Sequence, residues 1–79
     1  MAVAVYSTPS CSYCRLVKDW LKARNVKFDD YNVASDQRRA AEMVRKSGQM
    51  GVPVIDVGGT IIVGFDRGTI DEALKLNLS

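Results

Sequence analysis

The segment AVAVY at residues 2–6 is the feature of this sequence that most constrains its fold. It is short, carries valine at alternate positions, and is apolar on both faces, as is typical of a strand at the centre of a sheet. A strand without a polar face cannot leave one side of its sheet in water, so helices have to cover both faces. A chain of 79 residues has room for one such domain, and we expect a single domain over residues 1–79.

Three further segments show a clear periodicity. Residues 12–25 carry apolar side chains on one face and charged ones on the other, which predicts an amphipathic helix. Its apolar positions are Leu16, Val17, Trp20, Leu21 and Ala23. Residues 26–33 alternate through Val26 and Phe28 and predict a second strand. Residues 35–48 predict a second helix, which begins at a Ser-Asp cap and ends at a glycine.

The C-terminal third predicts a hairpin and a last helix. Residues 52–65 hold two β-rich runs around Gly58-Gly59, a dipeptide that favours a two-residue hairpin turn. The last helix is predicted from Thr69, because Thr69 and Glu72 have the spacing of a capping box. The predicted order is therefore β-α-β-α-β-β-α, an α/β domain. Its first two strands pair in parallel and the hairpin adds antiparallel strands, which makes a four-stranded mixed sheet.

Charge and hydropathy exclude several kinds of partner. The chain has 11 Lys and Arg against 9 Asp and Glu, and a net charge of +2 is too small to indicate nucleic-acid binding. The basic residues after the second cysteine alternate with apolar ones, and we interpret them as the solvated face of a helix. They are Arg15, Lys18, Lys22, Arg24 and Lys27. No apolar run reaches the roughly 18–20 residues that cross a bilayer, so no membrane association is expected.

The two cysteines, Cys11 and Cys14, lie three positions apart where the first strand gives way to the first helix. The first turn of a helix carries N–H groups without intrahelical partners, and these groups stabilise a thiolate. The spacing also lets the two sulfurs form a disulfide reversibly. We expect Cys11 to be the more exposed thiol that attacks first, and Cys14 to resolve the mixed disulfide.

Three other interpretations of the cysteine pair stay open at this point. A structural disulfide would close a four-residue loop and gain little chain entropy. The N-terminus MAVAVY lacks the features of a signal peptide, so we expect a cytoplasmic protein, and we expect it to be a monomer. A structural disulfide would be unusual in the cytoplasm. A structural zinc site would need a dimer, because one chain offers two thiolates and no histidine. The third alternative is two ordinary buried cysteines.

The dipeptide Val52-Pro53 stands at the start of a predicted strand. Proline cannot donate a hydrogen bond to a sheet, so Pro53 belongs at the first residue or the edge of a strand. A cis peptide bond at this point would turn backbone groups of Val52 outward as a short docking edge. A trans proline that starts a strand is the open alternative.

Together these residues resemble the glutaredoxins and glutaredoxin-like redoxins of the thioredoxin fold. The resemblance covers nearly the whole chain and rests on three motifs: Tyr6 followed by CxYCR, then Val52-Pro53, then Gly64-Phe65-Asp66. It implies a thioredoxin-like fold and a thiol–disulfide oxidoreductase with no permanently bound cofactor. The implied substrates are protein disulfides and glutathione mixed disulfides, with glutathione as reductant.

The resemblance also implies roles for individual residues. The first cysteine is the implied nucleophile and the second the resolving thiol, and Pro53 is implied to be cis. The backbone of Val52 would pair with the cysteinyl part of glutathione or with a substrate peptide. Asp66 and the start of the last helix would hold the γ-glutamyl amine, and Tyr13 would form a wall of the groove.

Four positions depart from the family pattern. Thr8 stands where many glutaredoxins have a lysine that binds the glycyl carboxylate. Ala40 stands where a Gln or Arg of the second helix usually helps, and the adjacent Arg39 could compensate in part. Gly51 replaces the usual threonine before Val-Pro, and Val63 replaces a usual glycine. Loss of a charge-assisted contact weakens binding by about 1.5–3 kcal/mol. The glycyl end of the glutathione site is therefore depleted, whereas the γ-glutamyl end is retained.

These departures leave two alternatives to a glutathione-dependent carrier. Gly64-Phe65 resembles the motif of the ribonucleotide-reductase redoxins, which thioredoxin reductase recycles, so Phe65 is a candidate substrate-binding residue in either class. Ser12 stands where many family members have proline, and some glutaredoxins of that type hold a 2Fe–2S cluster across a dimer. Cys11 of each chain and two glutathiones would then supply the four thiolates.

Overall fold

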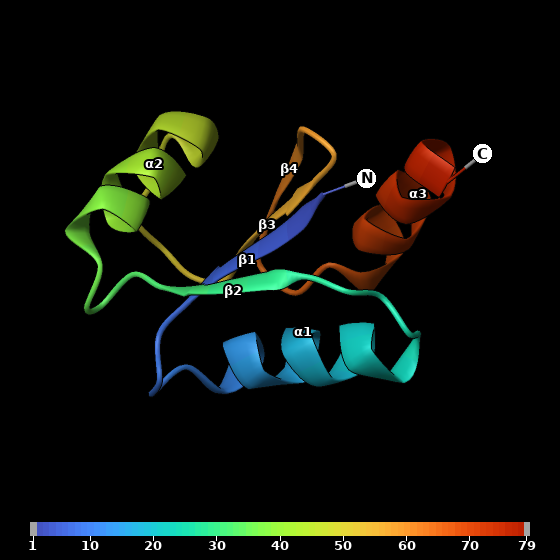
Figure 1. Ribbon diagram of the computed structural model, residues 1–79, viewed down its shortest axis with the longest axis horizontal. Helices are drawn as coiled ribbons and strands as arrows, with labels where there is room; N and C mark the ends of the chain where they lie inside the picture. Colours follow the sequence, from blue (N-terminus) through green and yellow to red (C-terminus); the bar gives the residue numbers. More distant parts are fainter. Residues whose placement is uncertain (1, 79) are drawn as a thin grey trace.

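The computed structural model describes residues 2–78, apart from the side chains of Asn77 and Leu78, and shows a four-stranded sheet between helices (Figure 1). The strands are β1 (Val3–Ser7), β2 (Asp29–Asn32), β3 (Val54–Val57) and β4 (Thr60–Val63). The helices are α1 (Ser12–Ala23), α2 (Gln37–Ser47) and α3 (Arg67–Leu78). The predicted order β-α-β-α-β-β-α is confirmed.

The sheet has the order β2-β1-β3-β4, so the apolar run at the N-terminus forms an interior strand, as predicted. β1 pairs in parallel with β2 and antiparallel with β3, and β4 pairs antiparallel with β3. Val5 lies opposite Asp30 on one side and Ile55 on the other. The mixed sheet is therefore confirmed, with β3 beside β1 rather than at an edge.

Alternate residues of β1 enter two separate cores. Val3 and Val5 belong to the larger core, which α1 and α3 cover with residues such as Leu21 and Ile70. Tyr6 points to the opposite face and packs with Met43 of α2 and Val54 of β3. Figure 1 shows α1 and α3 on the other side of the sheet from α2. Both faces of the sheet are thus covered by helices, as the apolar strand requires.

The second helix has the predicted caps. Asp36 precedes α2, and its carboxylate accepts a hydrogen bond from the Arg39 N–H at 3.1 Å. Gly48 follows the helix in the left-handed conformation, with φ of 72°, which costs glycine nothing because it has no Cβ.

The predicted strand over residues 26–33 is wrong in its first half. β2 covers only Asp29–Asn32, and Val26 and Phe28 lie in the segment before it, where both pack against the larger core. The N–H of Val26 donates to the Leu21 carbonyl at 3.0 Å, so the end of α1 holds this segment. Alternation of apolar side chains here reflects core packing without strand pairing.

Two further details differ from the prediction. α3 begins at Arg67 and not at Thr69, because the Asp66 carboxylate accepts the Thr69 N–H at 3.2 Å and thereby caps the helix. Leu16, predicted on the apolar stripe of α1, is 49% exposed, and Cys14, Val17 and Leu21 form the buried stripe. Residues 2–78 contain no helix with the length and apolar content needed to cross a membrane.

Candidate active site

Cys11 is the N-cap residue of α1. Its backbone is extended, with φ of −89° and ψ of 113°, and its Sγ accepts a hydrogen bond from the Cys14 N–H at 3.1 Å. The Cys11 N–H donates to the Thr8 carbonyl at 3.3 Å, which closes the turn between β1 and α1. Cys11 is half-exposed, and its sulfur takes the hydrogen bond of an N–H that has no partner within the helix, which stabilises negative charge on the sulfur.

Cys14 has the opposite environment. It is a free thiol like Cys11, but its side chain is fully buried. Burial, and after it the hydrogen bond with Cys11, raise the pKa of Cys14 to about 11. At neutral pH Cys14 is therefore a protonated thiol beneath the accessible sulfur of Cys11. Cys11 is the more exposed of the two, as predicted.

The Val-Pro loop lies against the first cysteine. The Val52–Pro53 peptide bond is cis, as the family resemblance implies. The Cys11 Sγ is 4.0 Å from the Val52 carbonyl oxygen, and the Pro53 carbonyl accepts the Gly64 N–H at 2.8 Å. This second contact ties the loop to the segment before α3, so the Val-Pro loop joins that segment to the Cys11 end of α1.

Gln49 is a residue of this site that the sequence did not reveal. Its side-chain amide donates to the Gly51 carbonyl at 3.0 Å, and its Oε1 accepts the Gly51 N–H. A Cβ added at Gly51 would lie 2.7 Å from that Oε1, too close for the present arrangement. The glycine that replaces the family threonine therefore makes room for Gln49, which braces the Val-Pro loop. No spacing or motif marks this pair, and only the contacts show it.

The other predicted residues are placed as follows. Tyr13 is 63% exposed, on the turn between the two cysteines. One carboxylate oxygen of Asp66 accepts a hydrogen bond from the Thr69 hydroxyl at 2.7 Å, and the other accepts one from the Thr69 N–H. These two bonds, that of the hydroxyl first, lower the pKa of Asp66. Phe65 is half-buried, and its ring meets Trp20 edge-on with 6.2 Å between centroids. Phe65 thus packs largely inward.

Arg39 is held by partners on its own side of the sheet. Its guanidinium forms an ion pair with Glu42 at 2.8 Å and lies over the Tyr31 ring at 4.0 Å. Thr8, half-buried beside Cys11, offers no charge. The two residues considered for the glycyl carboxylate therefore provide no free cation in this structure.

Within residues 2–78, no three or more His, Cys, Asp or Glu side chains form a group that could hold a metal ion. Cys14 is buried, so Cys11 is the one thiol that could ligate a shared cluster, and the remaining ligands would have to come from outside the chain. Two thiols in reach of each other can instead form and break a disulfide.

Comparison with known proteins assigns this geometry to a family. The family model described as glutaredoxin matches residues 3–62, which contain both cysteines and the cis proline. The chain belongs to the glutaredoxin family. As a member of that family, it is a thiol–disulfide oxidoreductase, an enzyme that acts on disulfide substrates with the help of a reductant.

Individual relatives of this glutaredoxin-family protein agree with that assignment. It is 45% identical over 73 residues to an uncharacterized glutaredoxin-like 8.6 kDa protein in the rubredoxin operon of Clostridium pasteurianum, covering 92% of this chain and 97% of the relative. It is 35% identical over 63 residues to the glutaredoxin-like protein NrdH of Lactococcus lactis, covering 80% and 86%. A crystal structure of a mutant of the thioredoxin-like protein BC3987 superposes with a TM-score of 0.88 and 25% identity, covering 92% and 94%.

Proposed function

We propose that this protein is a dithiol electron carrier that reduces protein disulfides through Cys11 and Cys14. The contrast between the two thiols carries the proposal. The Cys11 sulfur is accessible and accepts the Cys14 N–H at 3.1 Å, whereas Cys14 is fully buried with a raised pKa. Only one of the two thiols is therefore ready to attack a substrate, and the other stays protonated until a mixed disulfide forms beside it.

The reaction proceeds in two exchange steps. The Cys11 thiolate attacks one sulfur of the substrate disulfide, which forms a Cys11–substrate disulfide and releases the other substrate sulfur as a thiolate. Cys14 then loses its proton and attacks the Cys11 sulfur. This step forms the Cys11–Cys14 disulfide and releases the second substrate thiolate. The substrate gains two electrons and takes up two protons, and the carrier is left oxidised.

The groove beside Cys11 supports binding of an extended substrate segment. We infer that the backbone of Val52 pairs with the substrate, with Pro53 beneath it and Tyr13 as an exposed wall. Phe65 contributes through its packed ring and Asp66 through its exposed carboxylate at the start of α3. The hydrogen bond between Gly64 and Pro53 at 2.8 Å holds these two parts of the groove together.

We further propose that thioredoxin reductase, rather than glutathione, restores the dithiol. Binding of the glycyl carboxylate of glutathione needs a cation, but position 8 is a neutral threonine and Arg39 is paired with Glu42 at 2.8 Å. The solved NrdH-redoxin of Escherichia coli, 28% identical with a TM-score of 0.79, is described by a thioredoxin-like activity profile, which supports the same choice of donor. Asp66 and Val52 would still allow weak glutathione binding. A reducing compartment such as the cytoplasm fits a carrier that works as a dithiol.

Reduction of a protein disulfide tests the roles of the two cysteines. Insulin reduction with dithiothreitol as electron donor, followed as turbidity, should be accelerated by the protein and lost in Cys11→Ser. Cys14→Ser, mixed with insulin in the absence of dithiothreitol, should accumulate a mixed disulfide at Cys11, visible as a mass adduct, because attack at Cys11 is intact and the resolving thiol is missing. Turnover by the Cys11→Ser variant would contradict the proposed roles.

The electron donor is tested by NADPH oxidation in two coupled assays, one with glutathione and glutathione reductase and one with thioredoxin reductase. We expect turnover mainly in the second assay. Thr8→Lys should raise glutathione-dependent turnover roughly tenfold, because one charge-assisted contact is worth about 1.5–3 kcal/mol. Efficient turnover of the unmodified protein with glutathione would overturn the choice of donor and leave the dithiol mechanism in place.

A further inference from the structure

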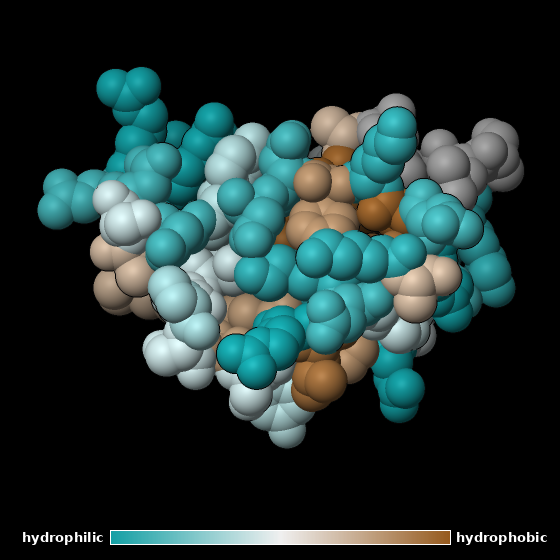
Figure 2. Space-filling model, turned by 60° about the horizontal axis from the view of Figure 1, so that its bottom comes forward, coloured by the Kyte–Doolittle hydropathy of each residue, from teal (hydrophilic) through white to brown (hydrophobic). Residues whose placement is uncertain are grey.

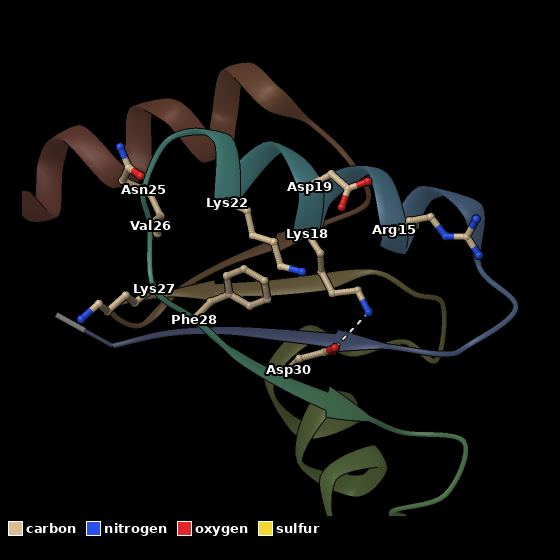
Figure 3. A pocket seen from close by; sticks show the side chains of 9 residues that line it. All are labelled: Arg15, Lys18, Asp19, Lys22, Asn25, Val26, Lys27, Phe28 and Asp30. Carbon is tan, nitrogen blue, oxygen red and sulfur yellow. Dashed lines mark hydrogen bonds and ion pairs between the residues drawn. The ribbon is translucent and has the colours of Figure 1, made fainter.

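A pocket of about 750 Å³ lies between α1 and the segment that leads into β2, and it shares no residue with the proposed active site (Figure 3). Figure 3 shows the Phe28 ring in its middle, below α1. The lining residues are Arg15, Lys18, Asp19, Lys22, Asn25, Val26, Lys27, Phe28 and Asp30. A volume of roughly 300–1,000 Å³ is usual for a small-molecule site. The pocket is thus large enough for an organic ligand.

The pocket holds the excess positive charge of the chain. Its lining has four basic and two acidic side chains, a net charge of +2, which equals the net charge of the whole sequence. Lys18 is paired with Asp30 at 2.9 Å. In the part of the chain that the structure describes, Arg15, Lys22 and Lys27 form no ion pair. An anion bound here would therefore displace no existing ion pair of these three cations.

The cations are spread along the pocket. Lys18 and Lys22 descend from α1 on the side of the Phe28 ring, and Arg15 and Lys27 extend at opposite ends (Figure 3). Arg15 and Lys22 lie seven positions apart on the helix, a rise of about 10 Å. This spacing suits an elongated ligand with more than one negative charge better than a single small anion.

The floor of the pocket is apolar. Val26 and Phe28 are half-buried, and both pack against the larger core, which fixes their positions. In the view that brings the α1 side forward, hydrophilic side chains surround patches of apolar surface (Figure 2). An aromatic floor below cationic walls binds a flat ring by stacking and an attached anion by charge.

We propose that this pocket binds a phosphorylated compound that carries a planar ring, the chemistry of a nucleotide. The ring would stack on Phe28, and the phosphates would lie between Lys22 and the basic residues at the pocket ends. Asn25 adds an amide that can donate to the ligand or accept from it. The pocket lies beside the helix that begins with the redox pair, but binding does not depend on the dithiol function proposed above.

A titration of the reduced protein, monitored by amide chemical shifts, tests the proposal with three compounds. ADP carries ring and diphosphate, pyrophosphate carries the charge alone, and adenosine carries the ring alone. We expect saturable binding of ADP with a Kd below about 1 mM, and binding at least tenfold weaker for the other two. The largest shifts should fall within residues 15–30.

Matched variants locate the site. Lys22→Gln with Lys27→Gln should weaken ADP binding about tenfold, because it removes two of the four cations that line the pocket. Arg38→Gln with Arg45→Gln removes the same charge from α2 and should leave binding unchanged. Phe28→Leu keeps an apolar side chain but removes the ring, and should weaken ADP binding several-fold while pyrophosphate binding stays the same.

Three results would overturn the proposal. The first is that ADP shows no saturable binding. The second is that the two double variants lose ADP binding equally. The third is that pyrophosphate binds as tightly as ADP and that Phe28→Leu has no effect on ADP binding. The first result would leave the pocket as a solvated basic surface or as part of a protein interface, and the last would leave a site for anions alone. Because the readout is binding, none of these results depends on disulfide turnover.

Discussion

Cys11 and Cys14 lie at the start of the same helix. Cys11 immediately precedes its first turn and Cys14 lies within that turn, yet water reaches only Cys11. The reason is geometric: the N-cap residue projects from the end of α1, whereas the residue three positions later lies on the buried stripe with Val17 and Leu21. Burial and the hydrogen bond with Cys11 raise the pKa of Cys14 to about 11, so Cys14 stays protonated at pH 8.

Alkylation should therefore distinguish the two thiols. Treatment of the reduced native protein with iodoacetamide at pH 8 should label Cys11 and leave Cys14 unlabelled, because the reagent attacks accessible thiolates. Tandem mass spectrometry of the peptide that ends at Arg15 locates the label. Both residues should react in denaturant, and native Cys11→Ser should remain unlabelled. Equal labelling of both thiols in the native protein would show that the asymmetry is absent in solution.

At the scale of elements, α2 is attached to the sheet by a polar network beside the small core of Tyr6, Met43 and Val54. The Lys46 amine donates to the Asp56 carboxylate at 2.7 Å and to the Tyr6 hydroxyl at 2.9 Å. It also lies 3.3 Å from Glu42. These partners, Asp56 first, raise the pKa of Lys46 well above its usual range, so the amine is charged throughout the accessible pH range.

Lys46→Met should lower the free energy of unfolding by about 1–3 kcal/mol, because it leaves the Tyr6 hydroxyl and the Asp56 carboxylate without their shared donor. Urea unfolding followed by far-UV circular dichroism measures the change. Arg45→Met, on the exposed side of the same turn, is the control and should stay within about 0.5 kcal/mol of the unmodified protein. Equal stability of the two variants would show that the network contributes nothing net.

At the scale of the whole molecule, Asp30 joins three elements. Asp30 lies on β2. Its carboxylate accepts a hydrogen bond from the Ser7 hydroxyl of β1 at 2.7 Å and forms an ion pair with Lys18 of α1 at 2.9 Å. Partial burial opposes ionisation, but the hydrogen bonds from Lys18 and Ser7 outweigh it and lower the pKa of Asp30. The folded protein therefore binds this proton less readily than the unfolded chain does.

This shift sets the direction of a pH dependence. Since the pKa of Asp30 is lowered, its contribution to stability is complete above the unfolded value of about 4 and is lost as the pH falls through the folded value. Asp30→Asn should reduce stability at pH 7 by about 0.5–1 kcal/mol, with solvent screening taken into account. Near pH 2 the difference should disappear. Asp29→Asn, the exposed neighbour, should have little effect at either pH, and a loss of stability from Asp30→Asn that does not change with pH would refute this account.

The elements predicted from the sequence succeeded where the deciding interactions are local. The strand at residues 2–6, the caps of α2 and the placement of Cys11 all follow from neighbours within four residues, and the structure agrees. The start of α3 was misjudged because two caps competed, and Asp66 holds Thr69 with two hydrogen bonds. The prediction that a strand starts at Val26 is wrong, because alternating apolar residues that face the core give the same sequence pattern whether or not their backbone pairs with a neighbouring strand.

What the sequence by itself determined is the order of elements, the need for helices on both faces of the sheet, and a cysteine pair at a helix start. These properties depend on periodicity and on spacing along the chain. Only the tertiary structure decided that β3 lies beside β1, that Glu42 holds Arg39, that Gln49 braces Gly51, and that four cations and Phe28 line one pocket. The pairing of β3 with β1 joins residues about fifty positions apart, whereas the other contacts lie within one to thirteen positions and still leave no mark in the residue pattern. Side-chain partners compete for each group in three dimensions, and the winner is set by packing rather than by the spacing of residues in the chain.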